Sequence, residues 1–289
     1  MPTSSIFAMD TGFFTSLGTY RFEARCEMLR ELGYDATYLT LWDEAAWADL
    51  PMLATVRERH GIGVAAVYAT LNIDAPADDP ENRLLPGLID RLDETRTIEL
   101  TLRSNDPAHP PSSTTGDDAA RRWLERLVPM ARARGITLAL YPHIRHWLER
   151  VDDAVRLCAA IDDPALRLTF PSFHWYAVDG TDLDGTLRRS APYLALVNIS
   201  GSRRLAPGTL AGNGIPATIE PADEGDLDLF ALLGALRRVG YGGPIGIQGY
   251  SVGGDAYAKL RRSLAAVRDV ERRLDAHPDW AVLRSPPFS

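Results

Sequence analysis

Short apolar runs alternate with amphipathic stretches along almost the whole chain. Most of these runs are apolar on both faces, which is typical of parallel strands that are covered by helices. They occupy residues 4–9, 36–41, 63–69, 97–102, 136–141, 166–170, 194–200 and 244–248.

Helical patterns separate the apolar runs. The clearest occupy 21–33, 45–61, 117–135 and 228–240, and each ends in Gly, the residue that commonly closes a helix in the left-handed conformation. Weaker patterns at 81–92 and 183–189 complete the series. Asp117 and Asp255 stand where side-chain N-caps belong.

Eight strand–helix alternations without a linker or a change of composition predict one (β/α)8 TIM barrel. We expect a single domain over residues 1–289, with an irregular tail from about residue 279. A doubly wound open sheet is the alternative. That fold normally has a Gly-rich phosphate-binding turn after its first strand, and "MDTGFFTSLG" offers none.

The composition narrows the possible partners. The chain is 45% hydrophobic and 24% charged, and its formal net charge of -8 argues against nucleic acid, since phosphate contacts need a basic surface. No apolar run approaches the length of a membrane span, and the first residues do not resemble a leader. We therefore expect a cytoplasmic protein without a membrane partner, and a homo-oligomer remains open. The two cysteines, in helical stretches, are expected to be small buried side chains.

In such a barrel, active-site groups follow the carboxyl ends of the strands. His143 and His174 do so on adjacent strands, and a histidine can move protons in either direction near neutral pH. They are the expected catalytic residues, whereas His146 is expected in the first turn of the next helix. Aromatic rings beside amides, hydroxyls and Arg suit a polyol ligand. By the same rule the expected substrate-binding residues are Tyr141, Trp42, Tyr68, Arg103, Trp175, Asn198, Arg203, Arg204, Gln248 and Tyr250.

Several segments together carry a family resemblance, notably "LYPHIRHWLERVDDAVRL", "LTFPSFHW", "LVNISGS" and "GYGGPIGIQGYSVGGD". With "FAMDTG" and "LGYDATYLTLW", the chain resembles the xylose isomerase-like TIM barrels, in particular their sugar phosphate isomerase/epimerase group. The resemblance places a substrate-contacting His at His174 and a substrate-binding Arg near Arg203 or Arg204. It also adds Glu220, in the long loop that follows, to the substrate-binding candidates.

The resemblance further implies a divalent metal held by Glu, Asp, His and Glu. In this chain those four positions fall at Tyr141, Pro171, Asn198 or Ser200, and Gln248. None offers a carboxylate or an imidazole, so we expect neither the four-ligand metal site nor another cofactor. The alternative is a Mn, Mg or Zn ion whose ligands are recruited from His143, His174, Asp10 or Glu220.

These patterns favour a sugar or polyol isomerase/epimerase-like enzyme that transfers a proton next to a carbonyl. Isomerisation, epimerisation and β-elimination all fit this chemistry, with a carbohydrate-like small molecule as ligand. The alternative is a catalytically inactive barrel that binds a carbohydrate or a partner protein. An abasic-site nuclease of the same superfamily is disfavoured, because the sequence has no sign of several metals or of a basic DNA-binding face.

Overall fold

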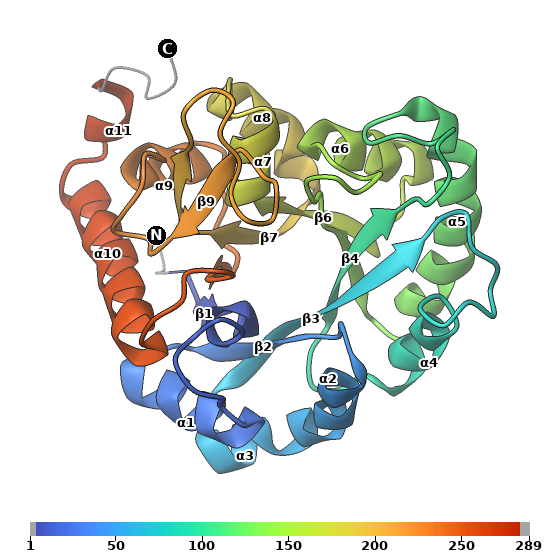
Figure 1. The fold of residues 1–289 in the computed structure, drawn as a ribbon, viewed down its shortest axis with the longest axis horizontal. Helices are drawn as coiled ribbons and strands as arrows, with labels where there is room; N and C mark the ends of the chain where they lie inside the picture. Colours follow the sequence, from blue (N-terminus) through green and yellow to red (C-terminus); the bar gives the residue numbers. More distant parts are fainter. Residues whose placement is uncertain (1–3, 284–289) are drawn as a thin grey trace.

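The computed structural model describes residues 4–283 and forms a closed barrel of parallel strands surrounded by helices (Figure 1). The predicted (β/α)8 TIM barrel is therefore confirmed. Around the barrel the strands follow the order β1-β10-β7-β6-β5-β4-β3-β2, and β2 pairs with β1 to close it. The barrel strands are β1 (Ile6–Ala8), β2 (Ala36–Thr40), β3 (Gly63–Asn72), β4 (Thr97–Arg103), β5 (Thr137–Leu140), β6 (Leu166–Pro171), β7 (Leu194–Ile199) and β10 (Ile245–Ile247).

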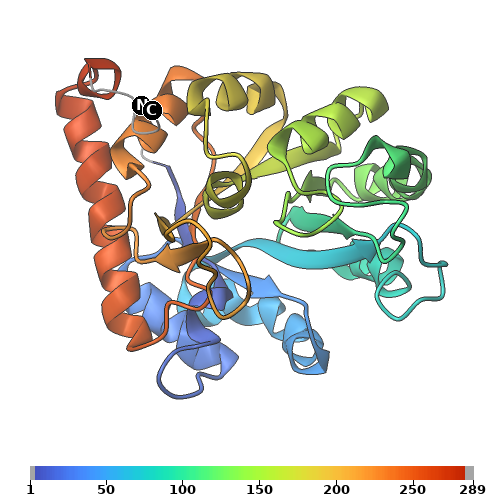
Figure 2. The same cartoon turned by 45° about the horizontal axis from the view of Figure 1, so that its top comes forward.

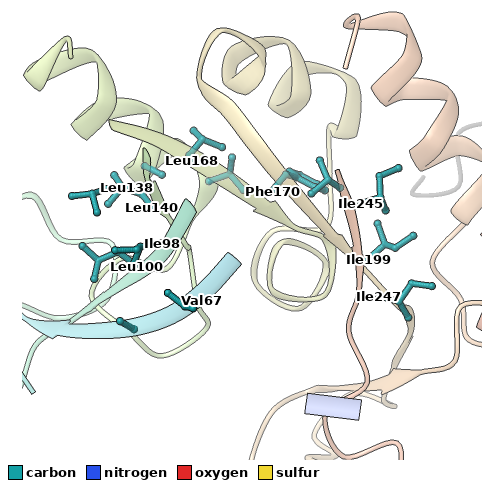
Figure 3. Close-up of a cluster of buried hydrophobic side chains, with 14 of the residues drawn as sticks. Val67, Ile98, Leu100, Leu138, Leu140, Leu168, Phe170, Ile199, Ile245 and Ile247 are labelled. Atoms are coloured by element: carbon teal, nitrogen blue, oxygen red, sulfur yellow. The ribbon is translucent and has the colours of Figure 1, made fainter. Parts of the chain in front are cut away.

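Side chains alternate between the two faces of the barrel wall, because successive residues of a strand point to opposite sides. On β4, Ile98 and Leu100 belong to the large core between strands and helices (Figure 3). The residues between and beyond them, Glu99 and Thr101, are fully buried in the barrel interior. Arg103 follows on the same inward face and reaches the carboxyl end of the strand.

The helices cover the outside of the barrel, and the long α10 packs beside α1 and α9 (Figure 1). They are α1 (Phe22–Leu32), α2 (Glu44–Asp49), α3 (Val56–His60), α4 (Leu84–Arg91), α5 (Asp117–Ala133), α6 (Val151–Ile161), α7 (Ser172–Val178), α8 (Leu183–Ser190), α9 (Leu229–Arg238), α10 (Ala256–Ala276) and α11 (Trp280–Leu283).

The single helix expected over 45–61 is wrong. The segment instead divides into α2, a 3-10 helix (Leu50–Thr55) and α3. Pro51 lies at the start of the 3-10 helix, where its missing N–H and its ring are tolerated, whereas inside a continuous α-helix they would break the hydrogen-bond ladder.

Helix ends follow the expected chemistry with one exception. Gly33 and Gly61 close α1 and α3 in the left-handed conformation, and the Asp255 side chain caps α10 by accepting from the Ala258 N–H. Asp117 is not an N-cap. It is the first residue of α5, and its carboxylate pairs with Arg156 instead.

Two elements at the carboxyl ends of the strands were not predicted. Helix α7 begins directly after β6, and an antiparallel hairpin of β8 (Gly201–Arg204) and β9 (Ala217–Glu220) follows β7. Figure 1 and Figure 2 show the hairpin and its loop, in orange, from two directions. The expected irregular tail is helical at α11, and its remaining residues lie outside the described range.

Within residues 4–283, none of the helices has both the length and the apolar character needed to cross a membrane. Cys26 and Cys158 are buried free thiols, as expected.

Candidate active site

A cavity of about 440 Å³ opens at the carboxyl ends of the barrel strands. This is the place where barrels of this architecture carry their sites, and the volume suits a small-molecule ligand. Among the expected site residues, those that line it are His143, His174, Tyr141, Trp42, Tyr68, Arg103, Gln248 and Tyr250.

The remaining expected residues lie outside the cavity lining. Trp175 is buried on α7, with its ring 5.7 Å from that of Phe170 in the core around the barrel. Asn198 is buried within the barrel, where its Nδ2 donates to both carboxylate oxygens of Glu99 at 2.9 and 3.1 Å.

The hairpin residues Arg203, Arg204 and Glu220 also lie outside the lining. Arg203 is exposed and pairs with Glu220 at 3.7 Å and with Asp226 at 3.4 Å. The Arg204 guanidinium stacks over the Tyr176 ring at 4.7 Å and donates to the Tyr176 carbonyl. Neither arginine faces the cavity that the histidines line.

The two predicted histidines lie side by side, with ring centroids 4.1 Å apart. His143 Nδ1 is 2.8 Å from the Ile144 carbonyl oxygen, which can only accept, so Nδ1 carries the proton and Nε2 the lone pair. His174 Nδ1 accepts from the Ile144 N–H at 3.4 Å, which places the His174 proton on Nε2. One short backbone segment thus holds the two rings in opposite tautomers, with one Nε2 as acceptor and the other as donor.

Burial keeps these rings neutral. It lowers the pKa of His143 to about 4, and the hydrogen bond to Ile144 opposes this decrease. Burial also holds the pKa of His174 well below its usual range, with a further decrease from the neighbouring His143 and His146. At neutral pH the cavity wall therefore presents imidazoles rather than imidazolium ions.

His146 is a third member of this stack, and its expected place in a helix is wrong. It lies in a turn before α6, its ring centroid 4.1 Å from that of His143, and its Nδ1 is 2.8 Å from Thr101 Oγ1. Burial lowers its pKa to about 3. Arg145, with a φ of 70°, makes this turn in the left-handed region, so no helical or strand period could have revealed it.

Three buried polar atoms in the lining have no hydrogen-bond partner: Thr11 Oγ1, His174 Nε2 and Gln248 Oε1. Each of these side chains belongs to a residue that is at least nine-tenths buried. Because buried polar groups are nearly always paired, partnerless ones that converge on one cavity indicate a polar ligand. Thr11 escaped the sequence reasoning because it lies within the 3-10 helix Asp10–Phe13 after β1.

A buried carboxylate below the cavity was also missed. Glu99, on the inner face of β4, accepts from Tyr38 OH, Thr169 Oγ1 (2.7 Å) and Asn198 Nδ2. Burial raises its pKa to about 7, and these three hydrogen bonds oppose the increase. Glu99 lies in the middle of β4 and not at its end, so the rule that site residues follow strand ends does not select it. The signal was a lone acidic residue at an inward position of an apolar strand.

The positions that would hold the family's metal do not fit a metal ion. Burial keeps the pKa of Tyr141 well above its usual value, so its hydroxyl stays neutral. Pro171 ends β6 without a side-chain ligand atom. Asn198, whose nitrogen bonds to Glu99, and Gln248 offer only neutral amide oxygens, and Ser200 offers only a hydroxyl, 3.3 Å from Ser202 Oγ. Protein sites for Mn²⁺, Mg²⁺ or Zn²⁺ ordinarily include at least one carboxylate or imidazole, and this set supplies neither.

The alternative ligand set is not brought together either. Among the described residues, no three of His143, His174, Asp10 and Glu220 have ligand atoms close enough to share an ion. The group that does is Asp74, Asp106 and His109, whose ligand atoms lie within 4.8 Å of one another in the loops after β3 and β4. His109 Nδ1 already contacts Asp74 Oδ1 at 2.6 Å.

The xylose isomerase-like TIM barrel family matches residues 26–270, and the chain belongs to this family. The fold is shared with many solved structures. A protein called IOLI with a bound zinc atom has a TM-score of 0.74 at 15% identity, over 93% of this chain and 98% of that one. An L-ribulose 3-epimerase gives 0.70 at 16% identity, over 98% and 100%. A 3-keto-D-glucoside 4-epimerase from E. coli gives 0.69 at 17% identity, over 92% and 100%. None of the curated proteins compared with the chain matches its sequence.

Proposed function

We propose that the chain is a carbohydrate isomerase or epimerase-like enzyme that transfers a proton next to a carbonyl, without the four-ligand metal site of its family. The observation that carries the proposal is the pair of hydrogen bonds with the Ile144 backbone that assigns opposite tautomers to His143 and His174. A carbonyl substrate needs a base for its C–H proton and a donor for its oxygen, and the two Nε2 atoms offer one of each.

In this mechanism His143 Nε2 removes the proton and the His174 Nε2–H donates to the carbonyl oxygen as it becomes an enolate. A base whose conjugate acid has a pKa of about 4 is weak, because burial disfavours the imidazolium. The enolate that forms beside it compensates, since opposite charges that develop together stabilise each other in a site shielded from water. Epimerisation requires that the proton return to the opposite face of the same carbon after the enolate has turned over in the cavity. Isomerisation requires that it return to the former carbonyl carbon while the hydroxyl proton on the deprotonated carbon passes to the former carbonyl oxygen.

Other lining residues bind and orient the substrate. Gln248 Oε1 and Thr11 Oγ1 lack partners and can bond to substrate hydroxyls. Trp42, with its ring centroid 5.7 Å from that of Tyr250 and 6.2 Å from that of Tyr68, offers an aromatic wall for the apolar face of a sugar.

Relatives in the family support the substrate class, since they include the ribulose and keto-glucoside epimerases named above. The IOLI protein binds zinc, so a divalent ion is compatible with this fold. In this chain the Asp74, Asp106 and His109 group is the described group whose ligand atoms lie close enough to hold one. No step of the proposed mechanism passes through it.

A second candidate is a barrel that binds a carbohydrate-like ligand or a partner protein without turnover. Neutral Tyr141 and Gln248 at the family's metal positions favour it, because they remove that site while leaving the cavity and its unpartnered polar atoms.

One experiment separates the two candidates. Ketoses, inososes and 3-keto-glycosides are incubated with chelator-treated protein in D₂O, and deuterium at the carbon next to the carbonyl is followed by NMR. We expect exchange that falls by about 100-fold or more in His143→Ala and His174→Ala. His277→Ala, which removes an exposed histidine outside the cavity lining, is the matched control and should retain full exchange. Binding without exchange would favour the inactive barrel, and exchange that survives in both cavity variants would refute the histidine assignment.

A further inference from the structure

The cavity has an apolar wall in addition to its polar floor. This wall is formed by Ile144, Phe173, Ile215, Ala217 and Ile219, which pack together as one cluster with Tyr250 at its edge. Three of its members come from the β8–β9 hairpin and its loop, and Phe173 comes from α7. Both elements are absent from the basic strand–helix alternation and stand directly over the carboxyl ends of β6 and β7.

The entrance to the cavity is apolar as well. Trp42 is half exposed, and the exposed Phe14 ring lies 5.4 Å from it, centroid to centroid. Leu210, also exposed, immediately precedes the lining residue Ala211 in the hairpin loop. A ligand of sugar character alone would leave this apolar surface in contact with water.

The guanidinium groups of both arginines in the lining already have protein partners. Arg103 forms an ion pair with Glu81, N to O at 2.7 Å, and a hydrogen bond to Asn105. Arg145 donates to the carbonyl oxygens of Asn213 and Gly214 at 2.7 and 2.6 Å. Together with the neutral imidazoles, this leaves the described part of the lining without an uncommitted cation for a phosphate group.

We propose that the cavity binds an uncharged glycoside with an aromatic or similarly apolar aglycone, in preference to a free sugar or a sugar phosphate. The sugar ring lies against Thr11, Gln248 and His174, whose polar atoms lack partners. The aglycone lies against the apolar wall that Phe173 and Ile219 form with their neighbours. The inference rests on the proposed function in one respect: that the part of the ligand bound by Thr11, Gln248 and His174 is a sugar.

The test measures the contribution of the aglycone. Dissociation constants are determined by calorimetry for phenyl and methyl glycosides of glucose, galactose, mannose and xylose, and for glucose 6-phosphate. Burying one aromatic ring predicts that the phenyl glycoside of the preferred sugar binds about 10- to 100-fold more tightly than its methyl counterpart. Failure of every phenyl glycoside to bind more tightly than its methyl partner would overturn the inference. Tighter binding of glucose 6-phosphate than of the glycosides would also overturn it.

A pair of variants locates the effect. Ile219→Ala shortens the apolar wall, whereas Leu205→Ala shortens a side chain of the same hairpin that does not line the cavity. The phenyl-to-methyl ratio should fall in Ile219→Ala and stay unchanged in Leu205→Ala, with circular dichroism confirming that both variants fold. An unchanged ratio in Ile219→Ala refutes the placement of the aglycone. If free ketoses exchange deuterium but phenyl glycosides bind no more tightly than methyl glycosides, this inference is wrong and the proposed function stands. If phenyl glycosides bind more tightly but no substrate exchanges deuterium, the proposed function is wrong and this inference stands.

Discussion

The burial of the Glu99 carboxylate predicts how the free energy of unfolding changes with pH when this residue is replaced. Replacing it by Gln preserves its shape. One Gln oxygen can still accept from Thr169 and Asn198, and the new amide can donate to the Tyr38 oxygen, because that hydroxyl is free to reverse its role. The variant should therefore fold, and it differs from the native chain mainly in losing a group that titrates.

The magnitude follows from the raised pKa. A folded-state pKa of about 7, against the ordinary glutamate value of 4.5, means that the unfolded chain releases the Glu99 proton first as the pH rises. The stabilising contribution of the protonated group is complete below pH 4.5 and is lost as the pH rises through 7. At about 1.4 kcal/mol per pKa unit, the loss over this window is about 3 kcal/mol.

The assay is urea denaturation of the native chain and Glu99→Gln at pH 5 and pH 8. The free energy of unfolding of the variant relative to the native chain should rise by about 2 to 3 kcal/mol between the two pH values. Glu27→Gln, which changes an exposed glutamate, is the control for general effects of charge. A difference between the native chain and Glu99→Gln that stays constant from pH 5 to pH 8 would refute the account of this carboxylate.

Three further predictions concern the cavity. Arg145→Ala removes the hydrogen bonds to Asn213 and Gly214, so amide hydrogen exchange measured by mass spectrometry should speed up in residues 205–216 and not in the barrel strands. Unchanged protection of residues 205–216 would contradict the claim that these bonds hold the hairpin loop. Thr11→Val removes a hydroxyl without a partner, so urea denaturation should show a change below about 1 kcal/mol, and a loss of more than about 2 would contradict its unpaired state. Because the pKa of His143 is about 4, the deuterium-exchange rate at limiting substrate should be flat from pH 8 to pH 6; a midpoint near 6.5 would show an ordinary imidazole.

The fold could be predicted because strands buried on both faces appear in the sequence as continuous apolar runs, and the helices between them appear as amphipathic stretches that end in Gly. The rule that sites follow strand ends also found much of the cavity, including His143, His174 and Gln248. It failed where the chain departs from simple alternation. Arg203 and Arg204 follow β7, but they occupy the exposed second half of the hairpin strand β8 and do not line the cavity.

Other parts of the site depend on contacts that leave little record in the sequence. The position of His146 depends on a left-handed turn at Arg145, and the neutrality of all three histidines depends on burial by segments distant in sequence. Glu99 was the exception. Apolar Ile98 and Leu100 on either side of it face the helices, so the two-residue period of a strand would have placed its side chain inward, although it was not predicted.

The central claim concerns the two protons on His143 and His174, and ¹⁵N NMR of the imidazole rings measures them directly. Long-range proton–nitrogen correlation spectra at pH 7, assigned with His143→Gln and His174→Gln, distinguish the two neutral tautomers and the imidazolium. The structure predicts a neutral His143 protonated on Nδ1 and a neutral His174 protonated on Nε2. An imidazolium at either position, or the same tautomer at both, would contradict the proposed mechanism.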